Sequence, residues 1–253
     1  MRTAAILPVK RFPLAKKRLG ESVADSLRRD LARAMVGDVL SALGECEAIE
    51  ATIVVTCESS VALAAGYIGA IVVEDSAEAG QSAAASLGLA KAIEEGFERA
   101  LCVPGDCPTL DPAELTELIA PTTPHGDGGS HCETPPARAR VTLKRELVIV
   151  PDRHGKGTNG LLLTPPNAIK PSFGPDSRAR HERLAREGSV RCRVEEPACL
   201  LLDIDTGEDL EALRERLANT PKGAPRTRAV LARAVSDEAT VSQGKAGRPQ
   251  EVA

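Results

Sequence analysis

Continuous hydrophobic runs alternate along the first half of the chain with stretches in which hydrophobic residues recur every three or four positions. The continuous runs are residues 3–9, 51–56, 69–75 and 99–106. The stretches with helical spacing are residues 22–43, 59–67, 80–97 and 111–119. Continuous runs predict strands that are buried on both faces, and strands that alternate with helices form a parallel sheet. The pattern therefore predicts an α/β fold with helices on both faces of the sheet.

The second half of the chain continues this alternation with two interruptions. Further strands are predicted at residues 146–155, 158–166 and 189–194, and in the run from Cys199 that ends on Asp203 and Asp205. Helices are predicted at residues 173–188 and 206–219. Residues 121–145 and 218–253 are rich in proline, glycine and polar or charged side chains, which predicts a flexible insertion and a disordered C-terminal tail. One folded domain over residues 1–217 remains.

The composition excludes several classes of function. Hydrophobic residues make up 42% of the chain but aromatic residues only 2%, so we expect an aliphatic core and no stacking platform for nucleic-acid bases. A net charge of −4 argues against a general polyanion-binding surface, so any phosphate site must be local. Seven cysteines without a C-x-x-C pair are typical of a reduced cytoplasmic protein. No run is long enough for a membrane span, and we expect neither a membrane nor a nucleic acid as partner.

Three acidic residues stand at the ends of predicted strands. Asp106 ends one strand, and Asp203 and Asp205 end another. Ligands of open α/β sheets bind at the carboxyl ends of the strands, and Mg²⁺ prefers carboxylate oxygens that it can bridge to substrate phosphates. Asp203 and Asp205 could instead serve only to start and cap the next helix, above all Asp205 together with Thr206, but Asp106 has no long helix to cap. The three carboxylates are therefore a candidate Mg²⁺ site.

A basic loop follows the first predicted strand. The segment PVKRFPLAKKRL carries Lys10, Arg11, Lys16, Lys17 and Arg18. The loop faces the same edge of the sheet as the three acids, where its positive charges could neutralise a triphosphate. A solvated basic surface is the alternative, because most single charge runs have no ligand. The place of this run directly after the first strand favours a binding role.

Glycine-containing segments supply neutral hydrogen-bond donors. DRHGKGTNGLLL and FGPDSRARH contain Thr158, Asn159 and Ser177, and Ser177 stands near the predicted start of a helix, where anions bind. A second phosphate-bearing substrate would fit these donors. A further segment begins at Gly80 and Gln81, where a helix of small residues either packs closely on the sheet or presents an edge to a base or ribose.

Five motifs occur in the order LPVKRFPLAKKRL, GDCPTL, DRHGKGTNGLLL, FGPDSRARH and LLLDIDTGEDL. Together they resemble the 2-phospho-L-lactate guanylyltransferase family of coenzyme F-420 biosynthesis, whose bacterial branch includes phosphoenolpyruvate guanylyltransferase. The resemblance covers residues 1–120 and 146–217. It implies a single Rossmann-like nucleotidyltransferase domain over residues 1–217, of the nucleotide-diphospho-sugar transferase type, with a mostly parallel mixed sheet and helices on both faces.

The resemblance also implies a reaction and a set of site residues. GMP would pass from GTP to phosphoenolpyruvate or 2-phospho-L-lactate, with release of pyrophosphate, and 3-phospho-D-glycerate is an alternative acid. By motif, the Mg²⁺ ligands are Asp106, Asp203 and Asp205, and the contacts to the phosphorylated acid are Thr158, Gly174 and Ser177. The nucleotide contacts are Lys10, Lys16, Gly80 and Gln81, and the catalytic residues are Lys10, Lys16 and Asp106. The oligomeric state stays open, with a homodimer as one option.

Other interpretations use the same residues differently. A nucleotidyltransferase for a sugar phosphate or a molybdopterin typically has a glycine-rich loop after the first strand, whereas this chain has no glycine before Gly20. A nucleotide-binding module with a degraded site would not need all three carboxylates.

Covalent catalysis is not indicated, because neither His154 nor His181 stands beside a nucleophile. Asp176 stands where the family has a small residue, and an acid there repels an anionic substrate unless it points outward.

Overall fold

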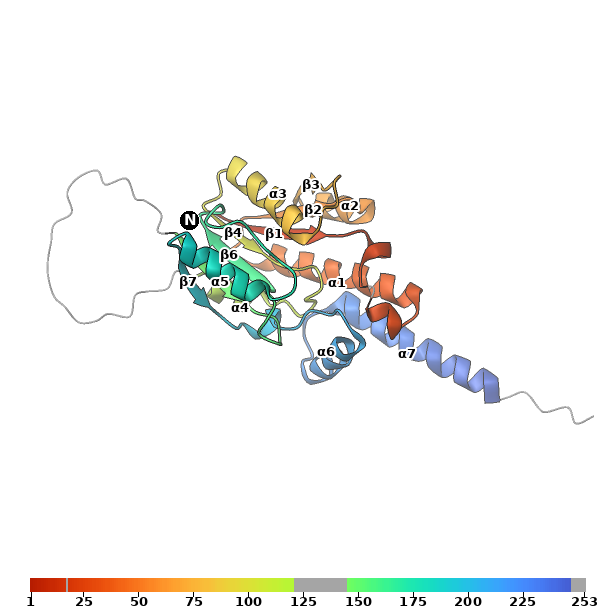
Figure 1. Ribbon diagram of the computed structural model, residues 1–253. Helices are drawn as coiled ribbons and strands as arrows, with labels where there is room; N and C mark the ends of the chain where they lie inside the picture. Colours follow the sequence, from red (N-terminus) through yellow and green to blue (C-terminus); the bar gives the residue numbers. More distant parts are fainter. Residues whose placement is uncertain (17, 121–144, 247–253) are drawn as a thin grey trace, which may run out of the picture.

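The structure is a computed structural model of the chain, and it describes residues 1–16, 18–120 and 145–246 (Figure 1). Lys17 and nearly all of the predicted insertion at 121–145 lie outside the described residues. In the described part, helices lie on both sides of a central sheet. None of the described helices combines the length and the apolar character that a membrane crossing requires.

A mixed sheet forms the centre of the described structure. Its seven strands follow the order β3-β2-β1-β4-β6-β5-β7. They are β1 (Thr3–Val9), β2 (Ala51–Thr56), β3 (Ile71–Glu74), β4 (Arg99–Cys102), β5 (Glu146–Val150), β6 (Gly160–Thr164) and β7 (Arg191–Val194). β6 runs antiparallel to both of its neighbours, β4 and β5, and the remaining pairs are parallel. The predicted α/β class with a mostly parallel mixed sheet is confirmed.

Seven α-helices and three short 3-10 helices lie between these strands or follow the last strand in the described residues. The α-helices are α1 (Asp25–Glu45), α2 (Ser59–Tyr67), α3 (Gln81–Glu94), α4 (Pro112–Ile119), α5 (Ser177–Glu187), α6 (Gly207–Asn219) and α7 (Pro225–Ala246). The 3-10 helices are η1 (Phe12–Leu14), η2 (Leu19–Glu21) and η3 (Ala198–Leu200). Asp111 caps α4 through its side chain and Pro112 begins the helix.

Alternate residues of the central strand β1 pack against different helices. Ala5 and Leu7 belong to a cluster with α1 and α4, whereas Ala4 and Ile6 face α3 and α5. Helix α3 comes so close to β1 that a Cβ atom added to Gly88 would lie 2.3 Å from Cγ2 of Ile6. The small residues of α3 therefore serve close packing, which is one of the two roles that the sequence allows.

The predicted strand that begins at Cys199 is wrong. Residues Ala198–Leu200 form η3, and the chain then runs without a strand ladder into α6. Leu200 and Ile204 are fully buried, so the hydrophobic pattern here reports burial rather than strand geometry. The N–H of Ile204 donates instead to the carbonyl oxygen of Asp106 at 3.1 Å. This bond brings the two acidic segments of the chain together.

The predicted disordered tail is wrong for residues 225–246, which form α7. The carboxylate of Asp38 in α1 accepts hydrogen bonds from the N–H groups of Arg226 (3.0 Å) and Thr227 (2.8 Å). Val230 and Leu231 are buried against α1 and α6. The charged and small residues between these positions conceal the apolar stripe in the sequence.

Candidate active site

A cavity of about 960 Å³ opens at the edge of the sheet where β1 and β4 end. Its walls come from the loop after β1, the start of α3, the loop after β4, the loop between β5 and β6, and the turns before α5 and α6. All ten predicted site residues line it: Lys10, Lys16, Gly80, Gln81, Asp106, Thr158, Gly174, Ser177, Asp203 and Asp205. Asp106 lies in the loop after β4 rather than on the strand, because β4 ends at Cys102.

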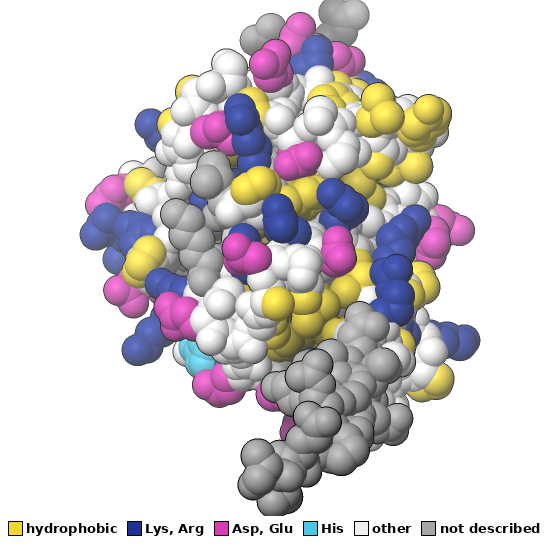
Figure 2. All heavy atoms as spheres, turned by 90° about the vertical axis from the view of Figure 1, so that its right-hand side faces the viewer, with side chains coloured by type: hydrophobic (Ala, Val, Ile, Leu, Met, Phe, Trp, Pro, Cys, Tyr) yellow, Lys and Arg dark blue, Asp and Glu magenta, His cyan; other side chains and the backbone are white. Residues whose placement is uncertain are grey.

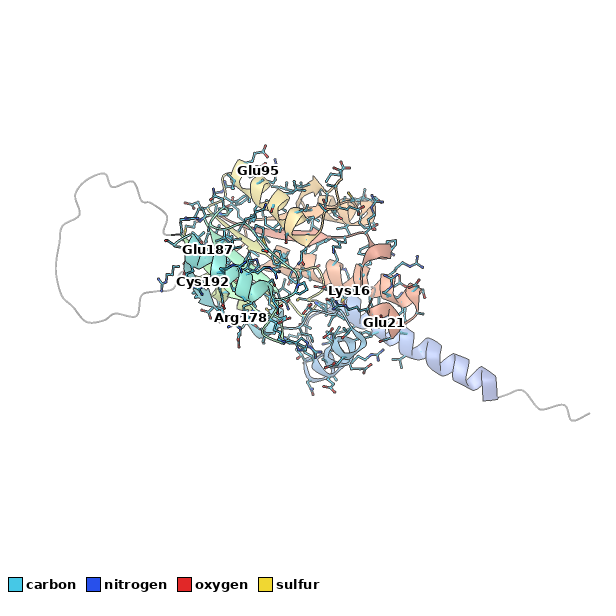
Figure 3. All side chains as sticks on the ribbon, in the orientation of Figure 1. Lys16, Glu21, Glu95, Arg178, Glu187 and Cys192 are labelled. Atoms are coloured by element: carbon cyan, nitrogen blue, oxygen red, sulfur yellow. The ribbon has the colours of Figure 1, made fainter. Side chains whose placement is uncertain are left out.

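One face of the molecule carries both positively and negatively charged side chains. On the face at the right of Figure 1, Lys and Arg side chains lie next to Asp and Glu side chains, with hydrophobic side chains between them (Figure 2). Lys16 lies on the side of the molecule that carries α6, away from Glu187 and Cys192 near α5 and β7 (Figure 3).

Three carboxylates converge in the cavity from two distant segments. Asp106, Asp203 and Asp205 each place one oxygen so that the three atoms lie within 4.8 Å of one another. Oδ1 of Asp106 is buried and has no hydrogen-bond partner among the described residues. A buried carboxylate oxygen without a donor is costly, and oxygen ligands at this spacing suit a hard divalent cation. The residues therefore fit a divalent metal site.

The environment of Asp203 opposes its ionisation when no metal is bound. Burial raises the pKa of Asp203 to about 6, and the negative charge of Asp106 adds to this effect. Nδ2 of Asn159 donates to Oδ1 of Asp203 at 3.1 Å and to the carbonyl oxygen of Leu200 at 2.8 Å. Asn159 thus holds the acidic segment against the loop between β5 and β6. The sequence indicates Asn159 only as a donor, because its partners lie more than forty residues away in the chain.

The ammonium group of Lys16 lies between two of the carboxylates. Its Nζ contacts Oδ2 of Asp106 and lies 2.7 Å from Oδ1 of Asp205, and the side chain is 9% exposed. Burial alone would lower the pKa of Lys16, but the charges of Asp106 and Asp205 raise it above its ordinary value. Lys16 therefore stays charged and offsets part of the negative charge of the cluster. Lys10, by contrast, is exposed at the rim.

Two helices begin at the cavity without a side-chain cap at their N-terminus. Gly80, with φ 104°, precedes α3 and offers no side-chain cap, so the first N–H groups of α3 are available to an anion. Asp176, with φ 53°, precedes α5 and likewise makes no side-chain cap. Asp176 is exposed at the rim of the cavity. Ser177, the first residue of α5, donates from its hydroxyl to that of Thr158 at 3.1 Å.

Comparison with known proteins places these residues in a family. Residues 3–125 match the family model described as guanylyl transferase CofC like. A phosphoenolpyruvate guanylyltransferase from Conexibacter woesei is 46% identical over 231 residues, which cover 91% of this chain and 96% of that protein. The chain belongs to the CofC-like guanylyl transferase family. Membership confirms the predicted class of enzyme, a nucleotidyltransferase that transfers a guanylyl group.

Relatives in this guanylyl transferase family differ in the acid that their names give. A phosphoenolpyruvate guanylyltransferase from Sphaerobacter thermophilus is 33% identical over 84% of this chain and 93% of that protein. A 3-phospho-D-glycerate guanylyltransferase from Colwellia psychrerythraea is 30% identical over 84% of this chain and 91% of that protein.

Solved structures agree with the fold. A protein from Desulfovibrio desulfuricans described as a nucleotide-diphospho-sugar transferase has a TM-score of 0.67 at 15% identity, covering 96% of this chain and 98% of that chain. A nucleotidyl transferase from Methanothermobacter has a TM-score of 0.57 at 18% identity, covering 86% of this chain and 98% of that chain. The guanylyl transferase chain thus has the predicted nucleotide-diphospho-sugar transferase fold.

Proposed function

We propose that this guanylyltransferase transfers GMP from GTP to phosphoenolpyruvate, with release of pyrophosphate, in coenzyme F-420 biosynthesis. The product is enolpyruvoyl-2-diphospho-5'-guanosine. The observation that carries the proposal is the convergence of three carboxylates and Lys16 in one cavity. A 46% identical relative named phosphoenolpyruvate guanylyltransferase supports the choice of acid.

Asp106, Asp203 and Asp205 would hold Mg²⁺. The partnerless oxygen of Asp106 and the hard oxygen donor set support this assignment. When bound there, the ion would neutralise negative charge on the reacting phosphates.

The side chains of the protein then bind and orient the two substrates. Lys10 and Lys16 are assigned to the triphosphate, and the loop at Gly80 and Gln81 to the nucleoside. The phosphate of the acid is already anionic at neutral pH, so its attack on the α-phosphorus needs no protein base. Catalysis would come from positioning and from charge neutralisation.

The acid would bind on the wall of the cavity formed by the loop before β6 and the turn before α5. Thr158, Gly174 and Ser177 line that wall. The first two N–H groups of α5, those of Ser177 and Arg178, donate to the carbonyl oxygens of Gly174 and Lys156, so the acid would contact side-chain hydroxyls and the turn at Gly174 rather than these N–H groups. Gly174 has φ 109°, a conformation that L side chains rarely adopt, and it leaves the turn open to a ligand.

Purified protein incubated with GTP, Mg²⁺ and each acid in turn tests the proposal through pyrophosphate release and product mass. We expect turnover to be fastest with phosphoenolpyruvate, slower with 2-phospho-L-lactate, and absent in Asp106→Asn with an unchanged circular dichroism spectrum. Near-normal turnover by Asp106→Asn would contradict the metal assignment. Absence of pyrophosphate with every acid would contradict the function.

3-Phospho-D-glycerate is the second candidate acid, because a 30% identical relative bears that name. It carries its phosphate on C3 and a hydroxyl group on C2, whereas phosphoenolpyruvate carries its phosphate on C2 of an enol, so the same assay decides between the two. A cytoplasmic location, in line with the unpaired cysteines among the described residues, and a homodimer also stay predictions. Size-exclusion chromatography with light scattering tests whether the protein is a homodimer.

A further inference from the structure

His181 lies fully buried behind the wall of the cavity that we assign to the acid. The side chain is 0% exposed and belongs to α5. The main-chain N–H of Ser172 donates to Nε2 at 2.9 Å, and Nδ1 lies 3.0 Å from Oγ1 of Thr158. A main-chain N–H can only donate, so Nε2 must accept and the proton of the neutral ring must be on Nδ1. Nδ1–H therefore donates to Thr158.

This tautomer determines what the hydroxyl of Thr158 can do. Oγ1 of Thr158 accepts from His181 and also from the hydroxyl of Ser177 at 3.1 Å. A hydroxyl oxygen has two lone pairs and one hydrogen, so both acceptor positions are filled. No acceptor for the remaining hydrogen lies among the residues that the structure describes, and Thr158 lines the cavity. Thr158 is left to donate to a ligand.

We propose that His181 is a positioning residue that fixes the Thr158 hydroxyl as a hydrogen-bond donor to the phosphorylated acid. The inference rests on the proposed function, because it assigns that acid to this wall. An anionic phosphate or carboxylate oxygen satisfies such a donor, whereas a donor group on the substrate does not. The network thus contributes to selection of an acidic substrate.

The surroundings of His181 keep the ring neutral and immobile. Burial lowers the pKa of His181 to about 4, and the positive charge of Arg180 adds to this effect. The ring of Phe173 packs edge-on against it, with centroids 5.3 Å apart at 76°. A protonated ring would donate from both nitrogens and oppose the N–H of Ser172. At neutral pH the main-chain N–H of Ser172 therefore determines the tautomer of His181.

Two matched variants separate the hydrogen bond to Thr158 from simple packing. The amide of His181→Asn reaches the position of Nδ1 and can still donate to Thr158. The amide of His181→Gln reaches the position of Nε2, so it can accept from Ser172 but cannot donate to Thr158. We expect His181→Gln to raise the KM for the acid about tenfold while the KM for GTP stays within twofold. In His181→Asn the KM for the acid should be several-fold below that of His181→Gln.

A packing role predicts the opposite order, because glutamine fills the buried volume better than asparagine. Equal KM values for the acid in the two variants, or an equal rise in the KM for GTP, would overturn the proposal. Adding Thr158→Val gives a double-mutant cycle. His181→Gln should have no further effect on the KM for the acid in the Thr158→Val background, and additive effects would also overturn the proposal.

The tautomer can be measured without any turnover. Long-range ¹H–¹⁵N NMR correlations on protein with ¹⁵N-labelled histidine distinguish Nδ1–H from Nε2–H, and His181→Gln identifies the signal. We expect Nδ1–H in the wild-type protein, and Nε2–H would overturn the inference. If no acid is turned over although Nδ1–H is found, the proposed function fails together with the assignment of the acid. If acid turnover is found with Nε2–H, only the inference fails.

Discussion

At the scale of single residues, the site depends on charged groups whose partners lie far apart in the sequence. Lys16 contacts Asp106 and Asp205, ninety and 189 positions away. The sequence predicted all three residues at one edge of the sheet, with Lys16 as a catalytic residue and a contact to the triphosphate. The structure adds that its ammonium group balances the acids, which only the folded geometry could reveal.

Replacing Lys16 tests this balance. Lys16→Met leaves three neighbouring carboxylates without their ammonium group, so we expect a loss of about 3 kcal/mol in the free energy of unfolding without metal. Mg²⁺ should then raise the melting temperature of Lys16→Met more than that of the wild-type protein. Lys10→Met, at the exposed rim, is the control for stability, and an equal loss in both variants would contradict the prediction.

The low pKa of His181 predicts a loss of stability in acid. The ordinary value of 6.5 applies to the unfolded chain and a value of about 4 to the folded protein, so protons bind preferentially to the unfolded state in between. This contribution to stability is complete above pH 6.5 and is lost as the pH falls toward 4. Between pH 7 and pH 5 the loss amounts to about 2 kcal/mol.

Chemical denaturation of wild-type protein and His181→Asn at both pH values isolates this contribution. The variant lacks the titrating ring, so its stability should fall by about 2 kcal/mol less than that of the wild-type protein. The same pH dependence in both proteins would show that His181 is already accessible to protons when folded.

At the scale of elements, the start of α6 holds one of the metal-ligand candidates in place. Thr206 and Asp209 form a capping box, in which the Thr206 hydroxyl accepts from the N–H of Asp209 at 3.2 Å. Oδ2 of Asp209 also accepts from the N–H of Asp205 at 3.1 Å. The sequence predicted Thr206 as the cap, and the structure shows that the same cap orders Asp205.

Removing the cap should therefore affect both stability and metal binding. We expect Thr206→Ala to cost about 1 kcal/mol in the free energy of unfolding. It should also weaken the apparent affinity for Mg²⁺ in the pyrophosphate assay several-fold, because Asp205 loses its support. Thr206→Ser keeps the hydroxyl and should retain both properties. A loss of stability with unchanged Mg²⁺ dependence would show that the cap does not support Asp205 as a metal ligand.

At the scale of the whole molecule, α7 extends the domain beyond its predicted end at residue 217. Its first turn donates two main-chain hydrogen bonds to the buried carboxylate of Asp38 in α1. A buried carboxylate at a helix N-terminus satisfies free N–H groups and interacts favourably with the helix dipole. This packing decides that the C-terminal segment is part of the folded structure.

Asp38→Ala should consequently destabilise the protein. We expect a loss of about 2 kcal/mol in the free energy of unfolding, because a buried and a partly buried N–H group lose their acceptor. Asp30→Ala is the matched control on the same helix, since Asp30 is exposed, and it should change stability by less than about 0.5 kcal/mol. Equal effects of the two variants would show that α7 contributes little to stability.

The sequence by itself determined the α/β class, most element positions and ten of the residues that line the cavity. It could do so because hydrophobic periodicity reports burial, and because strand ends in such a sheet meet at one edge. It misassigned the run after Cys199 and the segment of α7, where burial comes from tertiary contacts rather than from a repeating pattern.

Only the tertiary structure decided which of these residues touch. Three contacts join segments that are distant in the chain: the ion pair of Lys16 with Asp106, the hydrogen bond from Asn159 to Asp203, and the hydrogen bond between His181 and Thr158. Such contacts depend on distances and directions between side chains, which no local pattern encodes. The local sequence therefore determined which residues form the site, and the packing of the whole chain determined the charge states and hydrogen bonds of those residues.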